Sequence, residues 1–222
     1  MVKIQVNSQG KAYLTTGGKA LVAPEGGSSG KYQLLQRISD DNGNEIGTVS
    51  GFFTDANNVE YAVVCLDAQY RLGGLTWCSN ASTVVTDLPI YSTTQWGPWE
   101  AKETATYNTQ KILDFCVANS YTSAACSHCR TLSFTIDETI YYGQLPNMIE
   151  LNDIVRNHTA LNTADSTAGS HSSVDFSTGR NIWSSSQCAG NNAWCTGVLG
   201  STTYNKKTIT LSVVPVLELP NQ

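Results

Sequence analysis

The clearest hydrophobic pattern along the chain lies between residues 46 and 71. It reads IGTVSGFF, then the polar turn TDANN, then VEYAVVCLDAQYR, which is typical of two strands joined by a hairpin turn. The second strand is apolar nearly throughout. Because such a run needs cover on both faces, we expect this hairpin to form the centre of the sheet that organises the domain.

Two segments predict helices. The first runs from Ala105 to Ala118, with Thr and Asn residues ahead of it that can cap it. Its apolar residues at helical spacing are Ile112, Leu113, Cys116 and Val117. The second lies in YYGQLPNMIELNDIVRN, with Pro146 near its start and Asn147 as its cap. Its inner face is predicted to consist of Ile149, Leu151, Ile154 and Val155.

The two ends of the chain differ in pattern. Residues 1–40 predict a short β-rich arm, because polar and apolar residues alternate from Lys3 to Val22 and PEGGSSG is typical of a linker. The arm is either a partly ordered tail or an attachment or oligomerisation element. After Asn157 the composition predicts a long loop up to Arg180, followed by short strands near 182–185, 193–199 and 209–219. Residues 41–222 then form one domain.

Composition excludes several classes of protein. Charged residues are only 14% of the chain and the net charge is -5, and no basic run provides a nucleic-acid footprint. No segment is apolar enough to insert into a membrane, and the N-terminus does not read as a secretory signal. Without such a signal, we expect the seven cysteines to be mainly reduced thiols and not a disulfide framework.

Four short motifs follow one another in a characteristic order. They are Leu145-Pro146-Asn147 with Glu150-Leu151, Trp183-Ser184-Ser185-Ser186-Gln187, Ala193-Trp194 and Val214-Pro215-Val216. In this order, over about residues 45–222, the chain resembles bacterial and phage proteins with the C-type lectin fold, especially the variable proteins of diversity-generating retroelements. The resemblance implies an α+β, C-type-lectin-like fold, with a twisted antiparallel sheet, two helices and long loops.

The resemblance also implies a function. In that family an error-prone reverse transcriptase rewrites fixed surface positions near the C-terminus, and phage members bind a receptor on the host. The chain is therefore expected to be a hypervariable protein of a phage tail fiber, binding a host surface protein or glycan during host attachment. A homo-oligomer such as a trimer, built through the arm, would suit this role. The alternative within the fold is a lectin-like adhesin of the bacterial cell surface without diversification.

Residues 181–205 separate into a frame and a display surface. Trp183 and Trp194 suit anchoring roles, and the residues from Ser184 to Gln187 can hold an irregular segment through side-chain hydrogen bonds. The other residues show no periodicity, include two cysteines that are liabilities if exposed, and are otherwise rich in types used by adaptable binding surfaces. The predicted variable, ligand-binding residues are Asn181, Ile182, Cys188, Ala189, Asn191, Cys195, Gly197, Ser201, Thr202 and Tyr204. The alternatives are an ordinary surface loop or a Cys188–Cys195 disulfide.

Catalysis, cofactors and metals are not expected. The calcium-binding signatures of animal lectins are absent. Cys126-Ser-His-Cys129 has zinc-like spacing, but the chain offers no second pair of ligands, which favours either loop cysteines or a core pair. The alternative of another class resembles formylglycine-generating oxidoreductases, with Cys188 and Cys195 in the reactive role, although no His or acid pattern would activate their thiols.

Overall fold

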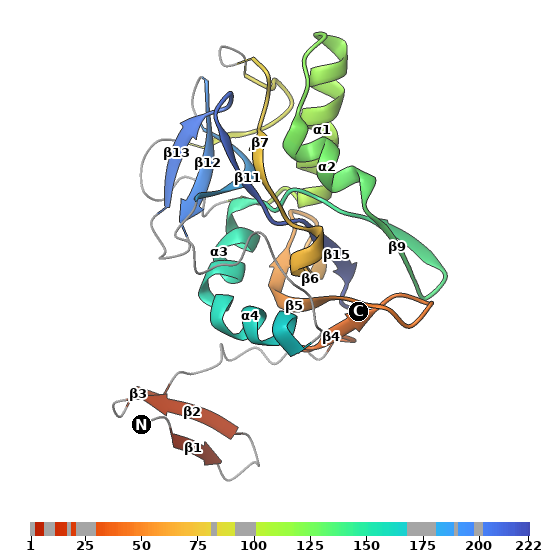
Figure 1. Cartoon of the computed structure of the whole chain (residues 1–222), viewed down its shortest axis with the longest axis vertical. Coiled ribbons are helices and arrows are strands. Elements are labelled where there is room, and N and C mark those ends of the chain that lie inside the picture. The colour runs from red at the N-terminus through yellow and green to blue at the C-terminus, as the bar shows by residue number, and fades with distance from the viewer. Residues whose placement is uncertain are drawn as a thin grey trace.

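A central sheet of four antiparallel strands, in the order β15-β6-β5-β4, organises the structure (Figure 1). The computed structural model describes residues 3–6, 12–16, 19–20, 30–80, 84–91, 101–167, 181–188, 191–197 and 202–222. The strands of this sheet are β4 (Arg37–Ser39), β5 (Glu45–Thr54), β6 (Glu60–Leu66) and β15 (Val216–Pro220). The hairpin expected at the centre of the domain is confirmed as β5 and β6.

Strand β6 is covered on both faces, as its apolar run predicted. Alternate residues of a strand point to opposite faces, and the side chains of β6 accordingly enter two different apolar clusters. Ala62, Val64 and Leu66 belong to one cluster, and Val63 and Cys65 belong to the other. The sheet is therefore the middle layer of the domain.

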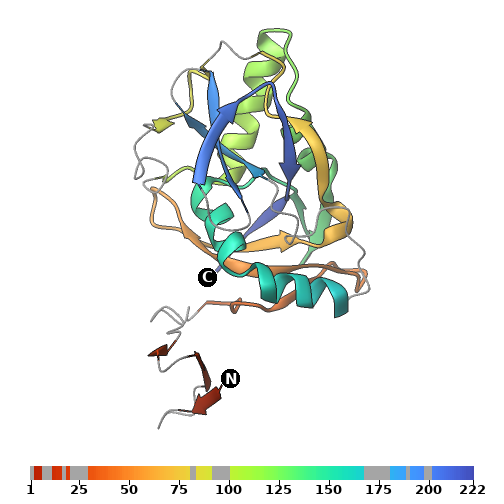
Figure 2. The ribbon, with the colours of Figure 1, turned by 60° about the vertical axis from the view of Figure 1, so that its left-hand side comes forward.

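Helices α3 (Met148–Arg156) and α4 (His158–Thr167) cover one face of this sheet (Figures 1 and 2). The capping box predicted from Asn147 is present: its side chain accepts hydrogen bonds from the first turn of α3, and Glu150 bonds back to the backbone of Asn147. The hairpin of β9 (Ser133–Ile136) and β10 (Thr139–Tyr142) contributes to the cluster on the opposite face.

A second sheet lies above the first in Figure 1, with strand order β13-β12-β11-β14-β7 and the short β8 paired to β11. Its strands are β7 (Leu72–Thr76), β8 (Ile90–Tyr91), β11 (Asn181–Cys188), β12 (Asn192–Gly197), β13 (Thr202–Lys206) and β14 (Thr210–Val213). Helices α1 (Ala105–Ala118) and α2 (Ala124–Thr131) share an apolar cluster with this sheet. Helix α1 has the bounds predicted from its spacing.

The described residues confirm an α+β fold and add two helices that the sequence did not predict. Helix α4 occupies residues 158–167 of the predicted loop, because Leu161 gives it an apolar contact with the core; residues 168–180 lie outside the described chain. Helix α2 was not predicted, although Ser123 caps it. Within the described chain, no helix is long and apolar enough to span a membrane.

The N-terminal segment forms a small sheet of its own. Strands β1 (Lys3–Val6), β2 (Ala12–Thr16) and β3 (Lys19–Ala20) pair antiparallel, which agrees with the hairpin expected there. Strand β4 falls within the range assigned to the arm, yet it pairs with β5. Tyr32 and Ile38 are buried in the core, so the main domain already includes residues ahead of position 40.

Candidate functional site

The predicted frame motif lies in β11, where all five residues from Trp183 to Gln187 are buried. The Trp183 indole N–H donates to the Leu75 carbonyl at 2.9 Å. The Ser184 hydroxyl donates to the Trp194 carbonyl at 2.9 Å, and the Ser184 carbonyl accepts from the Trp77 indole at 2.8 Å. Ser184 thus bonds to the Trp77 indole and to the backbone of Trp194, while the Trp183 indole bonds to β7. The burial of Trp183 and Trp194 agrees with the anchoring role expected for them.

Two further serines of the motif tie β11 to the helices. Ser185 Oγ accepts a hydrogen bond from the Asn108 amide of α1 at 3.2 Å. Ser186 Oγ accepts from the Met148 backbone N–H, at the start of α3, at 3.0 Å. A buried polar group without a partner costs about 1–3 kcal/mol, so these bonds favour one arrangement of β11, α1 and α3.

Gln187 clamps the segment that follows β7. Its Oε1 accepts from the Val85 N–H at 2.7 Å, and its Nε2 donates to the carbonyls of Val85 at 3.1 Å and Leu88 at 3.4 Å. The Lys207 ammonium donates to the same Oε1 at 2.8 Å. The clamp holds residues 85–88 in place although they lack regular secondary structure.

Lys207 is fully buried, which no feature of the sequence predicted. Its Nζ lies 4.6 Å from the centre of the Trp77 ring, a cation–π contact. Burial lowers the pKa of Lys207 to about 8, partly opposed by the nearby Cys78, Cys116 and Cys188. The pair Lys206-Lys207 carries no local signal for this role, because one of the two faces solvent and the other the core only in the folded chain.

Four residues of the predicted display surface are buried. Ile182, Cys188 and Cys195 are at most 1% exposed, and Gly197 is also buried. Strands β11 and β12 lie inside the sheet, between β13 and β14. Their burial contradicts the expectation that these positions face solvent, because interior strands are covered by neighbouring layers.

The remaining predicted residues lie nearer the surface or outside the described chain. Asn181, Asn191 and Thr202 are half-buried, and Tyr204 is 40% exposed on the edge strand β13. The Tyr204 ring stands edge-on to Trp194 at 5.6 Å between centroids. Ala189 and Ser201 lie outside the described residues. Ligand binding by this set stays a prediction.

The cysteine alternatives have clear outcomes. Cys188 and Cys195 are not joined by a disulfide and enter different apolar clusters, because Cys195 lies opposite Trp183 in the strand register. Cys126 and Cys129 are core residues of α2, which is one of the two alternatives favoured over a zinc site, and they do not lie in a loop. No group of three or more His, Cys, Asp or Glu in the described chain is placed to hold a metal ion.

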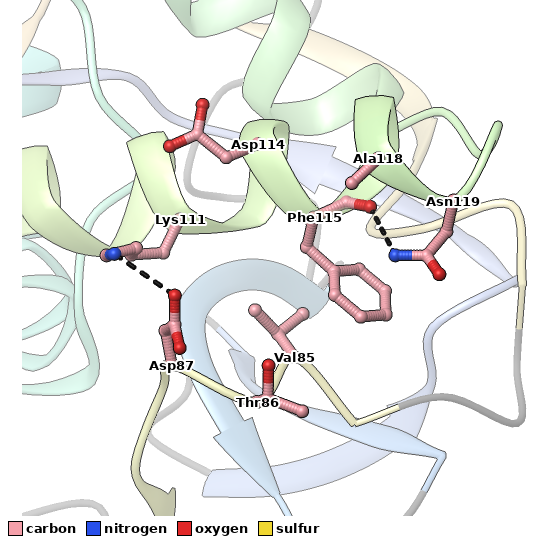
Figure 3. A pocket seen from close by; sticks show the side chains of 8 residues that line it. All are labelled: Val85, Thr86, Asp87, Lys111, Asp114, Phe115, Ala118 and Asn119. Carbon is pink, nitrogen blue, oxygen red and sulfur yellow. Dashed lines mark hydrogen bonds and ion pairs between the residues drawn. The ribbon is translucent and has the colours of Figure 1, made fainter.

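A groove with a volume of about 390 Å³ runs between α1 and the segment held by Gln187 (Figure 3). Its lining combines an aromatic ring, two carboxylates, an ammonium and an amide. The residues are Val85, Thr86, Asp87, Lys111, Asp114, Phe115, Ala118 and Asn119. The Lys111 ammonium bonds to the Asp87 carboxylate across the groove at 3.1 Å. The sequence gives no local signal for this groove, because its two walls come from separate segments.

Buried carboxyl groups join α1 and α3 to the central sheet. Glu218 of β15 accepts hydrogen bonds from the N–H groups of Ala105 at 2.8 Å and Thr106 at 2.9 Å, at the N-terminus of α1, where negative charge is favourable. Burial, together with the neighbouring Glu218, raises the pKa of Glu150 well above its usual value. This cluster fixes the helices and lies apart from the groove lining.

Comparison with known proteins gives one informative similarity. No protein family matches the chain, and no curated protein matches it. Among solved structures, a fimbrial protein from Bacteroides ovatus is similar, with a TM-score of 0.52 and 15% sequence identity. The similarity covers 98% of this chain and 48% of that protein, so the chain spans about half of its length. At this identity the similarity concerns the fold.

Proposed function

We propose that this chain is a non-enzymatic binding domain of a bacterial surface adhesin. The observation that carries the proposal is the fold similarity to a fimbrial protein over 98% of the chain. Fimbriae are surface appendages, and the bacterial cell surface is accordingly the proposed location. The burial of Ile182, Cys188 and Cys195 removes the physical argument for a hypervariable phage protein, so we favour an adhesin without diversification.

We further propose that the fold is of the C-type lectin kind. Its support is the antiparallel central sheet with the C-terminal strand β15 paired to β6, the two helices α1 and α3, and a second sheet that carries the Trp183–Gln187 motif. In this arrangement a rigid frame supports irregular connecting segments. The segment of residues 85–88 is one of these, and Gln187 fixes it.

The proposed ligand is a host surface glycan bound in the groove beside α1. The half-exposed Phe115 offers an aromatic face for the C–H groups of a sugar ring. The exposed Asp114 and Asn119 offer hydrogen-bonding groups for hydroxyls. A volume of about 390 Å³ is within the usual range for ligand sites. The affinity of a single open site is expected to be low and to be raised by multiple copies on one surface.

The proposal of a binding protein in place of an oxidoreductase is supported by the state of the candidate thiols. Burial raises the pKa of Cys195 to about 11, and Cys188 is fully buried in an apolar cluster. Reactive cysteines need a thiolate that a substrate can reach. Both sulfurs are buried where a substrate does not reach them, and the raised pKa of Cys195 also disfavours its thiolate.

The test is a glycan-array screen with the purified chain, followed by affinity measurement on the best glycan by biolayer interferometry. Asp114→Ala and Phe115→Ala are expected to weaken binding by 10-fold or more, roughly the loss of one good polar or stacking contact. Tyr204→Ala is the matched control on the second sheet and should leave affinity within about 2-fold. Melting curves of each variant check that the fold is retained.

Two outcomes would count against the proposal. If no glycan on the array binds the folded chain above background, the glycan ligand is wrong. If Tyr204→Ala abolishes binding while the groove variants retain it, the ligand contacts β13 and not the groove.

A further inference from the structure

Two cysteines from distant parts of the chain meet in the core beside the groove. Cys78 follows β7 and Cys116 lies near the end of α1, 38 positions further along the chain, yet their sulfur atoms are 3.8 Å apart. Both side chains are buried, at 1% and 2% exposure. Bringing the sulfurs to the bonded distance of about 2.05 Å requires a closure of roughly 1.8 Å.

We propose that Cys78 and Cys116 form a disulfide bond when the chain folds in an oxidising compartment outside the cytoplasm. The oxidant is a disulfide, either that of a small monothiol or that of a protein. The proposal rests on the surface location in the proposed function, since disulfides persist mainly in such compartments. It does not depend on which ligand occupies the groove.

The reaction consists of two exchanges. The Cys78 thiolate attacks one sulfur of the oxidant, forming a mixed disulfide and releasing one thiol of the oxidant. The Cys116 thiol then loses its proton and attacks the sulfur of Cys78, releasing the remaining part of the oxidant as its thiolate, which takes up a proton. Two S–H bonds of the chain are replaced by one S–S bond, and the disulfide of the oxidant is reduced to two thiols.

The surroundings assign different parts to the two sulfurs. The hydrogen bond from the Cys116 thiol lowers the pKa of Cys78 to about 6, with help from the Asn80 N–H at 3.5 Å and the Lys207 ammonium. The same contact and burial raise the pKa of Cys116. Because Cys78 also accepts the hydrogen bond from the Asn80 N–H, negative charge is better stabilised on its sulfur than on that of Cys116, and we assign Cys78 as the attacking group.

The disulfide would covalently link the two segments that form the walls of the groove. The segment it closes, residues 78–116, contains residues 85–87 on one wall and Lys111, Asp114 and Phe115 on the other. A disulfide constrains the unfolded chain more strongly as the closed loop lengthens. For a loop of this length, we expect the oxidised chain to melt on the order of 10 °C above the reduced chain.

The experiment is a count and a map of free thiols. The full chain is unfolded in urea and refolded either with a glutathione redox pair or with a strong reductant, so that access to buried sulfur does not limit the reaction. Thiols are then counted with a chromogenic disulfide reagent under denaturing conditions. Of the seven thiols, two should disappear only in the glutathione sample, and mass spectrometry should find the peptide of Cys78 linked to that of Cys116.

Two single variants make the result specific. The variant Cys116→Ser should show the same number of thiols after refolding with glutathione as after refolding with the reductant. Cys129→Ser, a buried cysteine of the same cluster, should still lose two and should keep the linked peptide. The proposal is overturned if all seven thiols of the parent chain stay free after refolding with glutathione, or if Cys78 is linked to Cys126 instead. A failed glycan screen would leave this outcome unaffected, so the two proposals fail separately.

Discussion

The buried Lys207 predicts an unusual dependence of stability on pH. Its side chain is fully buried, and burial lowers its pKa from 10.5 to about 8 in the folded protein, while the unfolded chain retains the ordinary value. Between these two values the unfolded state binds more protons than the folded state. Because stability then rises with pH, the penalty for burying the ammonium is complete below about pH 8 and is relieved toward pH 10.5.

The magnitude follows from the two pKa values. Each unit of difference is worth about 1.36 kcal/mol, so the whole penalty is about 3 kcal/mol. Between about pH 7 and pH 9.5 the free energy of unfolding should rise by about 2 kcal/mol from this group alone. Lys207→Met keeps the length of the side chain and removes the titrating group, so the rise should be absent from the variant.

The assay is urea unfolding at several pH values under reducing conditions. Because the thiol of Cys78 is perturbed in the same direction, the comparison is made between Cys78→Ser and the double variant Cys78→Ser with Lys207→Met. The matched control is Lys206→Met, at the exposed neighbouring lysine, which should not change the slope. If the two curves run parallel from pH 7 to 9.5, Lys207 titrates as an exposed lysine and the reasoning is refuted.

Three further predictions concern buried residues of the fold. Trp183→Ala should lower the free energy of unfolding by about 3–5 kcal/mol, because the ring is fully buried, while Tyr204→Ala should cost about 1 kcal/mol or less by chemical denaturation. Burial raises the pKa of Asp153 to about 6, so its contribution to stability should fall by about 2 kcal/mol as pH rises from about 4 to 6; pH-dependent melting of Asp153→Asn should lack this fall, and an unchanged slope would disprove it. Gly47→Ala would place its Cβ 2.5 Å from the Cys65 carbonyl, and a loss of about 2 kcal/mol is expected in urea unfolding; a variant as stable as the parent would show that the strands can separate at no cost.

Local patterns predicted the parts of the fold that depend on neighbours in sequence. The spacing of apolar residues located α1, the sequence Pro146-Asn147 located the start of α3, and the run around Val63 located the central strand. In each case the relevant interactions lie within a few residues, as in the capping box. Helix α4 was missed because its polar composition resembles a loop and its packing depends on contact with β5.

The sequence by itself also determined which residues of the motif Trp183–Gln187 form a frame, because large indoles and short hydroxyl side chains have few other uses together. Only the tertiary structure decided which way their neighbours face. Whether Cys195 is exposed depends on β13 and β14 flanking the inner strands, and the approach of Cys78 to Cys116 joins segments 38 positions apart. The groove is likewise built from two distant segments. Such features depend on long-range pairing, which leaves no periodic trace in the local sequence.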